Sequence, residues 1–393
     1  MKLYVGGFGL RGDGYPNAER TIALLSQQND IEIIQCGGWL PETLQLWRLA
    51  RMPRWRATWS LLGLIARNLL SLIRLLGKIR HAPAPVYVPY PSIFFLGWVS
   101  LLPRRWRPFC IVDAYISIWD SLVRDRAGSP ARGWQSRVLK SIEARSLKIA
   151  ALVLVDTQAN RELMSEEFGL KTSQVRSLPL AIDESHFVDL EDYVSRAPSY
   201  RLRILFVGTL IPLHGVPTLL DAIRELLPDP RFEFRIIGNG QMGGLVKEFE
   251  SECQAGAITW ISEWCSLDQI ASEIAAADIC LGVFGGENKA ARVLPFKVYM
   301  YLAAGRAVIS QSKLSTPEGV PFPPIEAVQP IDAKGLVEAI RRLANDSSKR
   351  ERLSAEGRIY YRKWLANSCL SKDWRQLITQ LQALVELVSI GEP

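Results

Sequence analysis

Short apolar runs alternate with longer segments of helical periodicity along most of the chain. In the first half, this pattern predicts strands at residues 3–5, 31–35, 86–88, 109–112, 152–155 and 175–178. The second half begins with a predicted strand at 202–207, a loop at 208–215 and a helix at 216–226. Repeated strand-helix pairs are typical of a doubly wound parallel sheet. The pattern therefore predicts an α/β fold with two Rossmann-like domains.

Length and composition favour the same organisation. The chain has 393 residues, which is more than one hydrophobic core normally organises. Hydrophobic residues make up 48% and charged residues 22%, values of a globular protein. We expect a first domain at residues 1–190, a second at 200–365, and a closing helical segment at 366–393.

Cysteine usage and the N-terminus bear on the cellular compartment. The six cysteines are scattered without a CxxC pair, which argues against a zinc site and a disulfide framework. The first ten residues, MKLYVGGFGL, enter a strand directly and lack the long apolar core of a signal peptide. We therefore expect a protein of the reducing cytoplasm that is not exported.

The most informative segment is residues 284–309, where a glycine-rich, positively charged loop leads into a helix. Gly285 and Gly286 let the backbone approach a ligand, and Lys289 and Arg292 stand next to the helix start. Free amides, a positive helix end and two cations form an anion site. The alternative is an ordinary turn with a solvated Lys and Arg, which the loop alone does not exclude.

Further residues of this segment carry a family resemblance. They are Pro295, Lys297, Met300, Ala303, Ala304, Gly305, Val308 and Ile309. With the segments at 204–223, 235–240 and 177–187, they form four motifs in order. The set resembles GT-B glycosyltransferases of the family 4 type, the group 1 glycosyl transferases that build bacterial cell-surface glycans.

The resemblance implies a GT-B fold, with two domains facing a cleft and a last helix that crosses back to the first domain. It implies a nucleotide-diphosphate sugar as co-substrate, with no cofactor and no metal. The implied donor-binding residues are Gly12, Gly14, Gly208, Thr209, His214, Gly238, Gly240, Gly285, Gly286, Arg292 and Lys297.

Three departures from the family pattern affect the donor site. The family's Arg and Lys of the phosphate loop are replaced by Thr209 and His214, and the ribose-binding glutamate is replaced by Met300, which cannot accept two strong hydrogen bonds. Lys289 and Arg292 are expected to supply the missing charge. His214 either contacts a phosphate or sugar of the donor or is a surface turn residue.

The catalytic candidates are Asp113, Glu287 and Lys289. Glu287 is placed near the donor sugar, or else is a solvated loop acid. Asp113 follows a strand and is the preferred cleft acid, while Asp120 and Arg124 are expected to bind the acceptor. In a retaining transfer of this family the leaving phosphate can accept the incoming proton, so the main requirement is charge stabilisation on the diphosphate.

A basic, apolar region occupies residues 43–112, which contain eleven Lys or Arg and no Asp or Glu. Within it, one arc of a helical wheel is polar: Arg56, Ser60, Gly63, Arg67, Ser71, Arg74 and Lys78. Trp55 and Trp59 precede this helix, as suits an anionic lipid surface. A transmembrane span is disfavoured, because Arg67 and Arg74 would each cost about 2.5 to 3.5 kcal/mol at a bilayer centre. The alternative is a domain helix with a solvated basic stripe.

Together these features predict a hexosyltransferase that moves a sugar to a lipid-linked or cell-surface glycan, with retention, at the inner face of the cytoplasmic membrane. No nucleic-acid-binding module is recognised. Two alternatives stay open: a non-hydrolysing nucleotide-sugar epimerase of the same fold, and an inactive GT-B scaffold of glycan assembly, which Met300 and Thr209 favour.

Overall fold

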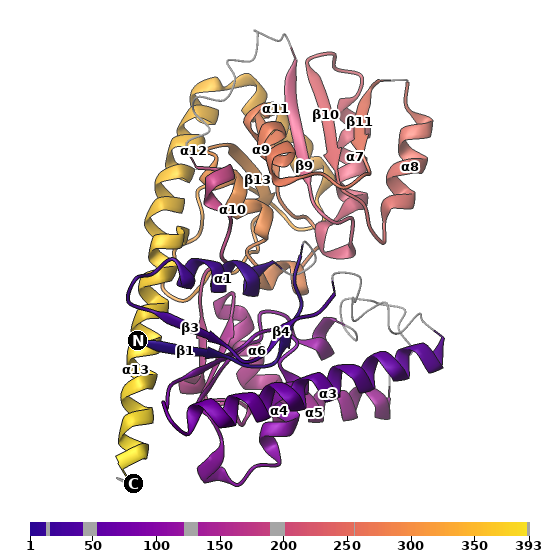
Figure 1. Ribbon diagram of the computed structural model, residues 1–393. Helices are drawn as coiled ribbons and strands as arrows, with labels where there is room; N and C mark the ends of the chain where they lie inside the picture. Colours follow the sequence, from indigo (N-terminus) through magenta and orange to yellow (C-terminus); the bar gives the residue numbers. More distant parts are fainter. Residues whose placement is uncertain (13–15, 42–52, 122–132, 189–200, 255, 391–393) are drawn as a thin grey trace. The chain divides into compact units, whose positions relative to one another are not determined.

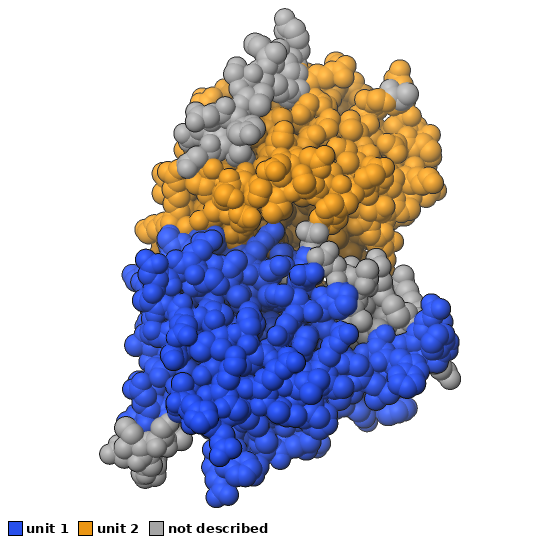
Figure 2. Space-filling model, in the orientation of Figure 1, with its two compact units in different colours: residues 1–181, 367–393 blue, residues 182–366 orange. Residues whose placement is uncertain are grey.

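The chain folds into two compact α/β units. The computed structural model describes residues 1–12, 16–41, 53–121, 133–188, 201–254 and 256–390. Unit 1 comprises residues 1–181 and 367–393, and unit 2 comprises residues 182–366 (Figure 2). The division after residue 181 falls earlier in the chain than the predicted boundary, which left residues 182–190 in the first domain.

Unit 1 contains a six-stranded, all-parallel sheet in the order β3-β1-β5-β6-β7-β8 (Figure 1). Its strands are β1 (Lys2–Val5), β3 (Glu32–Gln35), β5 (Val86–Val88), β6 (Cys110–Asp113), β7 (Leu152–Val155) and β8 (Val175–Ser177). A separate pair joins β2 (Phe8–Gly9) to β4 (Gly38–Trp39). The six predicted strands of this half are all present.

Helices cover both faces of the unit 1 sheet. They are α1 (Asn17–Ser26), α3 (Arg54–Ile79), α4 (Ile93–Ser100), α5 (Trp134–Leu147), α6 (Gln158–Phe168) and α13 (Asn367–Ile390). One core contains side chains of α3, α4, α5 and α6, and the core on the other face contains side chains of α1 and α13. Trp374 of α13 packs edge-on against Tyr87 of β5, with ring centroids 5.2 Å apart. The predicted return of the last helix to the first domain is confirmed.

Unit 2 has a second six-stranded parallel sheet, in the order β11-β10-β9-β12-β13-β14. Its strands are β9 (Leu202–Val207), β10 (Phe232–Ile237), β11 (Ile258–Ile261), β12 (Ile279–Leu281), β13 (Ala307–Gln311) and β14 (Glu326–Val328). In sequence order this is 3-2-1-4-5-6, the order of dinucleotide-binding sheets. Since the order reverses between β9 and β12, the loops after these two strands are expected to hold a ligand.

The helices of unit 2 are α7 (Val216–Leu226), α8 (Gly243–Glu252), α9 (Leu267–Ala275), α10 (Phe296–Ala303), α11 (Ala333–Asn345) and α12 (Ser347–Tyr360). The largest core packs α7, α8 and α11 against the sheet. Ser266 and Gln269 form a capping box at the start of α9, which satisfies the first free amides of that helix.

Helix α3 has 26 residues and a strongly apolar composition. Its segment Trp55–Ile79 is long and apolar enough to cross a membrane by those two criteria, and it is the one such helix in the described part of the chain. Ser71, predicted on the polar outer face, is fully buried, and its Oγ accepts a hydrogen bond from the Gly7 amide at 2.8 Å. The predicted outer face was wrong at this residue because the loop between β1 and β2 supplies a polar partner.

Candidate donor site

Two loops at the carboxyl edge of the unit 2 sheet touch through their backbones. A Cβ on Gly215, in the loop after β9, would lie 2.4 Å from the carbonyl carbon of Phe284, in the loop after β12. A Cβ on Gly285 would lie 2.2 Å from the carbonyl oxygen of Leu213. The Phe284 amide also donates to the His214 carbonyl oxygen at 3.2 Å. Only glycine permits this contact, so the predicted glycine loops are one structural element.

The turn after β10 joins the same group. A Cβ on Gly238 would lie 2.3 Å from the carbonyl oxygen of Gly208, and one on Gly240 would lie 2.9 Å from the Leu210 amide nitrogen. Gly208 and Gly238 have φ of 149° and 116°, in a region that side chains disfavour. The structure therefore brings together the predicted glycines of all three strand-end turns.

Lys297 lies in the first turn of α10, directly below Gly208. Its side chain is buried, with 4% of the residue exposed, and Nζ lies 3.6 Å from the ring centroid of Phe206. A Cβ on Gly208 would be 2.8 Å from Nζ. Among the described residues Nζ has no hydrogen-bond partner, and burial holds the pKa of Lys297 well below its usual range. Such a lysine is ready to accept an anion that stabilises its charged form.

His214 packs against the same Phe206 ring as Lys297. The ring is buried and meets Phe206 edge-on at 5.6 Å between centroids. Burial first, and then the Lys297 charge, lower the pKa of His214 well below its usual range. The imidazole hydrogen-bonds the Thr209 backbone, while Nδ1 is buried without a partner in the described residues. His214 is therefore neutral at pH 7, and the alternative of a surface turn residue is wrong.

A buried amide holds the second glycine loop in place. Gln311, at the end of β13, accepts from the Gly286 amide at 3.1 Å and donates to the Gly286 carbonyl at 2.9 Å. The preceding Ser310 bonds the Val283 amide through Oγ at 3.0 Å. The sequence analysis missed both residues. The signal was a pair of polar residues that ends an otherwise apolar strand.

Three predicted residues of this loop, Glu287, Lys289 and Arg292, lie nearer the surface. Lys289 and Arg292 are at the two ends of a short 3-10 turn, η7 (Lys289–Arg292), and both are half-buried. Glu287 is exposed and forms an ion pair with Lys313, as its alternative interpretation expected. Thr209 is exposed, and Met300 is buried inside α10. Lys297 is thus the most deeply buried of the predicted donor cations.

The candidates in unit 1 are enclosed. Asp113 has 0% exposed surface, and its two oxygens accept from the Tyr87 hydroxyl at 3.1 Å and the Tyr115 amide at 3.2 Å. Asp120 is also buried. Neighbouring strands and turns thus supply partners for the Asp113 side chain, and the cleft role of Asp113 and the acceptor role of Asp120 stay predictions.

The rest of the first glycine loop is described only in part. The Gly12 amide donates to Glu19 Oε2 at 3.3 Å, which ties the loop to the start of α1. Gly14 and Arg124 lie outside the described residues.

A buried carboxylate next to Asp113 was not predicted. Glu143 of α5 accepts hydrogen bonds from the amides of Ile118 and Trp119 and from the Ser117 hydroxyl, at 2.8 to 3.1 Å. Burial raises the pKa of Glu143, and these bonds oppose the rise. Its contacts are those of a residue that holds the turn after β6 in place.

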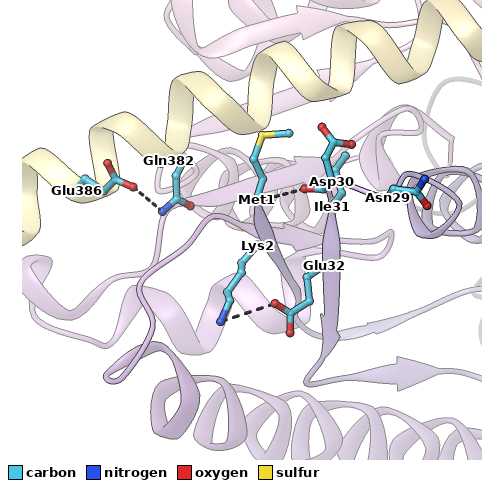
Figure 3. Close-up of a pocket in the computed structure, with 8 residues that line it drawn as sticks. All are labelled: Met1, Lys2, Asn29, Asp30, Ile31, Glu32, Gln382 and Glu386. Atoms are coloured by element: carbon cyan, nitrogen blue, oxygen red, sulfur yellow. Dashed lines mark hydrogen bonds and ion pairs between the residues drawn. The ribbon is translucent and has the colours of Figure 1, made fainter.

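An open hollow of about 610 Å³ lies at the opposite edge of the unit 1 sheet (Figure 3). It is lined by Met1 and Lys2 at the start of β1, by Glu32 at the start of β3 and by α13, and the Met1 ammonium donates to the Asp30 carbonyl at 2.6 Å. Because ligands of such sheets bind at the carboxyl ends of strands, this hollow is not the donor site.

Comparison with known proteins agrees with the geometry of unit 2. Residues 201–346 match the family model "Glycosyl transferases group 1". The match runs from β9 to the end of α11 and so includes every loop of unit 2 described above. No curated protein matches the sequence significantly.

Solved structures match over the whole chain. Sucrose-phosphate synthase from Thermosynechococcus elongatus is 16% identical, with a TM-score of 0.68 over 98% of this chain and 100% of that one. Anabaena HepE in complex with UDP-glucose is 12% identical, with a TM-score of 0.65 over 97% and 100%. WaaG, a glycosyltransferase involved in lipopolysaccharide biosynthesis, is 12% identical, with a TM-score of 0.62 over 96% and 100%.

These structures establish the fold. Residues 201–346 match the group 1 glycosyltransferases, and the chain has the GT-B fold.

Proposed function

We propose that this enzyme binds a nucleotide-diphosphate sugar in unit 2 and transfers the sugar to a lipid-linked or cell-surface glycan acceptor, with retention. The observation that carries the proposal is the buried amine of Lys297, which has no hydrogen-bond partner in the described structure. An isolated buried charge costs several kcal/mol, and a bound diphosphate would offset that cost.

The chemistry follows from where the charge develops. As the bond between the anomeric carbon and the phosphate oxygen breaks, negative charge grows on the departing diphosphate. The Lys297 amine is a fixed donor for that charge. In this proposal the protein's own cation, rather than a metal, stabilises the leaving group.

His214 is suited to a different part of the donor. Since Nδ1 has no partner, the ring nitrogen bonded to the Thr209 backbone is Nε2, and the neutral ring leaves Nδ1 as an acceptor. A lone-pair acceptor repels phosphate oxygens but accepts from a hydroxyl. We assign His214 to a sugar hydroxyl of the donor, and the diphosphate to Lys297.

The proposed acceptor and the proposed place of action rest on analogy with proteins of similar structure. The WaaG structure is described as that of an enzyme of lipopolysaccharide biosynthesis, and the structures of HepE contain UDP or UDP-glucose. By analogy we propose a glycan acceptor, a UDP-sugar as the first donor to test, and action on the inner face of the cytoplasmic membrane.

The test uses Lys297→Met with the matched control Lys334→Met, an exposed lysine of the same unit. We expect Lys297→Met to weaken UDP binding by about 1.5 to 3 kcal/mol in calorimetry, the typical loss of a charge-assisted hydrogen bond. The unliganded variant should melt at the same or a higher temperature, because a buried polar group without a partner is removed. Equal UDP affinity of the two variants would overturn the assignment.

Activity is tested with labelled UDP- and GDP-sugars and a membrane extract. Nucleotide release that depends on lipid supports transfer. Epimer formation without lipid supports an epimerase of the same fold, and a protein without donor binding is an inactive scaffold.

A further inference from the structure

The outer face of α3 carries an apolar stripe. Trp55, Trp59, Leu62, Leu70 and Ile73 all have half or more of their surface exposed, and Trp59 reaches 71%. At 100° per residue these five positions fall within an arc of about 80°. A stripe of this length on a single exposed helix marks an interaction surface, because monomeric proteins rarely leave such a patch uncovered.

A basic stripe borders the apolar one. Arg56, Arg67, Arg74 and Lys78 occupy the next arc of about 40°, between the exposed apolar residues and the buried face. In the described part of the chain, no carboxylate lies within ion-pair distance of Arg67 or Arg74. Residues 43–112 contain no acid at all, so this surface has no counter-charge of its own near α3 in sequence.

Elements near α3 in the fold or in the sequence also expose apolar and basic side chains. Helix α4 packs against both α3 and α5, and on α5 the exposed side chains of Trp134, Val138 and Ile142 follow one another at intervals of four residues. After α4, Trp106 is exposed beside Arg105 in the 3-10 turn η1 (Arg104–Trp106). Tryptophan combined with arginine at an apolar boundary is typical of the lipid headgroup layer.

The inner face of α3 is tied to the sheet. Asn68 Oδ1 accepts from the Phe8 amide at 3.2 Å and Ser71 Oγ accepts from the Gly7 amide at 2.8 Å. On α4, Trp98 Nε1 donates to the Ile65 carbonyl oxygen at 2.9 Å. A helix that supplies these contacts belongs to unit 1 (Figure 1), so its apolar stripe suits a surface contact and not a membrane span.

We propose that α3 docks unit 1 on an anionic lipid membrane, with the helix parallel to the surface, the apolar stripe in the acyl boundary and the basic stripe at the headgroups. This inference deepens the proposed function, which places the enzyme at a membrane, and vesicle binding tests it separately from sugar transfer. Because Gly7 and Phe8 contact the inner face of α3, the glycine-rich loop after β1 would lie about one helix diameter, 10–12 Å, from the lipid. A lipid-linked acceptor therefore has a short path to that loop.

Flotation of the full chain with vesicles tests the proposal. Wild type should float with phosphatidylcholine vesicles that contain 30% phosphatidylglycerol, should float at least tenfold less with pure phosphatidylcholine, and should be released by raised salt. Arg67→Glu with Arg74→Glu should reduce binding at least tenfold. The control, Lys334→Glu with Arg352→Glu in unit 2, makes the same change in net charge at exposed positions and should bind as wild type.

The apolar stripe is tested by Ile73→Ser against Ile359→Ser, residues with 57% and 65% exposure. We expect only the first to weaken binding, by about threefold to tenfold. Both positions are exposed, so the fold should be unchanged in circular dichroism. Equal flotation on neutral and anionic vesicles, or full binding of the charge-reversed α3 variant, would overturn the proposal. Self-association through the stripe, lost in Ile73→Ser without vesicle binding by wild type, would also overturn it.

Discussion

The two units share a six-stranded parallel sheet but organise its carboxyl edge in different ways. In unit 2, glycines at three strand ends place backbone against backbone, and a buried lysine waits below them. In unit 1, the Asp113 carboxylate at the end of β6 is already bonded to Tyr87 and Tyr115. A buried group without a partner, such as Lys297 Nζ, is a candidate for ligand binding, whereas a carboxylate with two partners, such as that of Asp113, stabilises its own unit.

The two units also differ in how their arginines are paired with carboxylates. In unit 2, Arg203 and Arg235 lie between Glu233 and Glu273, with N–O distances of 2.5 to 3.8 Å. Among the described residues, Arg67 and Arg74 of α3 in unit 1 have no such partners. The charges of this group in unit 2 are paired internally, whereas these two cations of unit 1 are open to an outside partner.

The largest effect is expected from Trp374→Ala. Loss of this buried ring from the core of unit 1 should cost about 3–5 kcal/mol. Hydrogen exchange should show lost protection in β1, β5 and β6, with unit 2 amides unchanged. Trp264→Ala, an exposed tryptophan of unit 2, serves as the control and should change stability by less than about 0.5 kcal/mol. Equal loss of protection in both units would show that units 1 and 2 do not unfold separately.

Gly285→Ala should affect the donor site most strongly. The added Cβ would meet the Leu213 carbonyl oxygen at 2.2 Å, so the two loops must separate. We expect UDP affinity to fall about 100-fold, equivalent to about 2.7 kcal/mol, in calorimetry. Gly244→Ala, where nothing lies within 4 Å of the added Cβ, should bind UDP normally. Retained affinity in Gly285→Ala would show that backbone contact is not what forms the site.

Lys289→Ala and Arg292→Ala test the two cations of η7. Each is expected to weaken donor binding by about 1.5–3 kcal/mol, because the sequence predicts that each cation bonds the donor diphosphate. Calorimetry with UDP checks this, with Lys334→Ala as the control. Unchanged affinity in both variants would leave Lys297 as the donor cation that the geometry supports.

The pH dependence separates Lys297 from the exposed lysines. Its pKa is lowered in the folded state, so between that value and about 10.4 the unfolded chain binds more protons. Stability of the free protein should therefore rise with pH in this window, by at most about 1.4 kcal/mol per pH unit for one group. Lys297→Met should remove the rise.

The same pKa shift predicts proton uptake when UDP binds. The anion restores the charge of Lys297, so UDP affinity should fall as pH rises toward 10.4. For His214 the lowered pKa predicts a loss of stability as pH falls below about 6.5. Melting curves and calorimetry from pH 5 to 10 check both. A flat profile for wild type would falsify the assignment of Lys297.

The smallest effect is expected at Gly77 in α3. No atom lies within 4 Å of an added Cβ, so Gly77→Ala should stabilise unit 1 by about 0.5–1 kcal/mol through helix propensity alone. Chemical denaturation measures this change. A loss of stability would show that the outer side of α3 is more crowded than the structure indicates.

Regular elements with local signals were predicted from the sequence almost to the residue. The strand at 202–207 and the helix at 216–226 are β9 and α7 with the same bounds. The bounds of such elements follow from apolar periodicity, and for α7 also from Gly215 and Pro217 at the helix start.

Features that depend on distant partners were not predictable in this way. The Asp113 carboxylate is occupied by Tyr87, which lies 26 residues away in the chain. Ser71 is buried because Gly7 offers an amide 64 residues away. A helical wheel shows which residues of α3 share a face, but it does not show which face packs against the rest of unit 1. Apolar side chains of α3 lie on both the buried and the exposed face.

The path of the chain through the two units has a consequence for biosynthesis. Unit 2 is one continuous segment, residues 182–366, inserted between two parts of unit 1. The core of unit 1 requires Leu370, Trp374 and Leu381 from the last helix. On the ribosome, unit 2 can finish folding while unit 1 still lacks one face of its core. The donor domain is therefore expected to mature first, and truncation before residue 370 should leave it folded while unit 1 stays open to proteolysis.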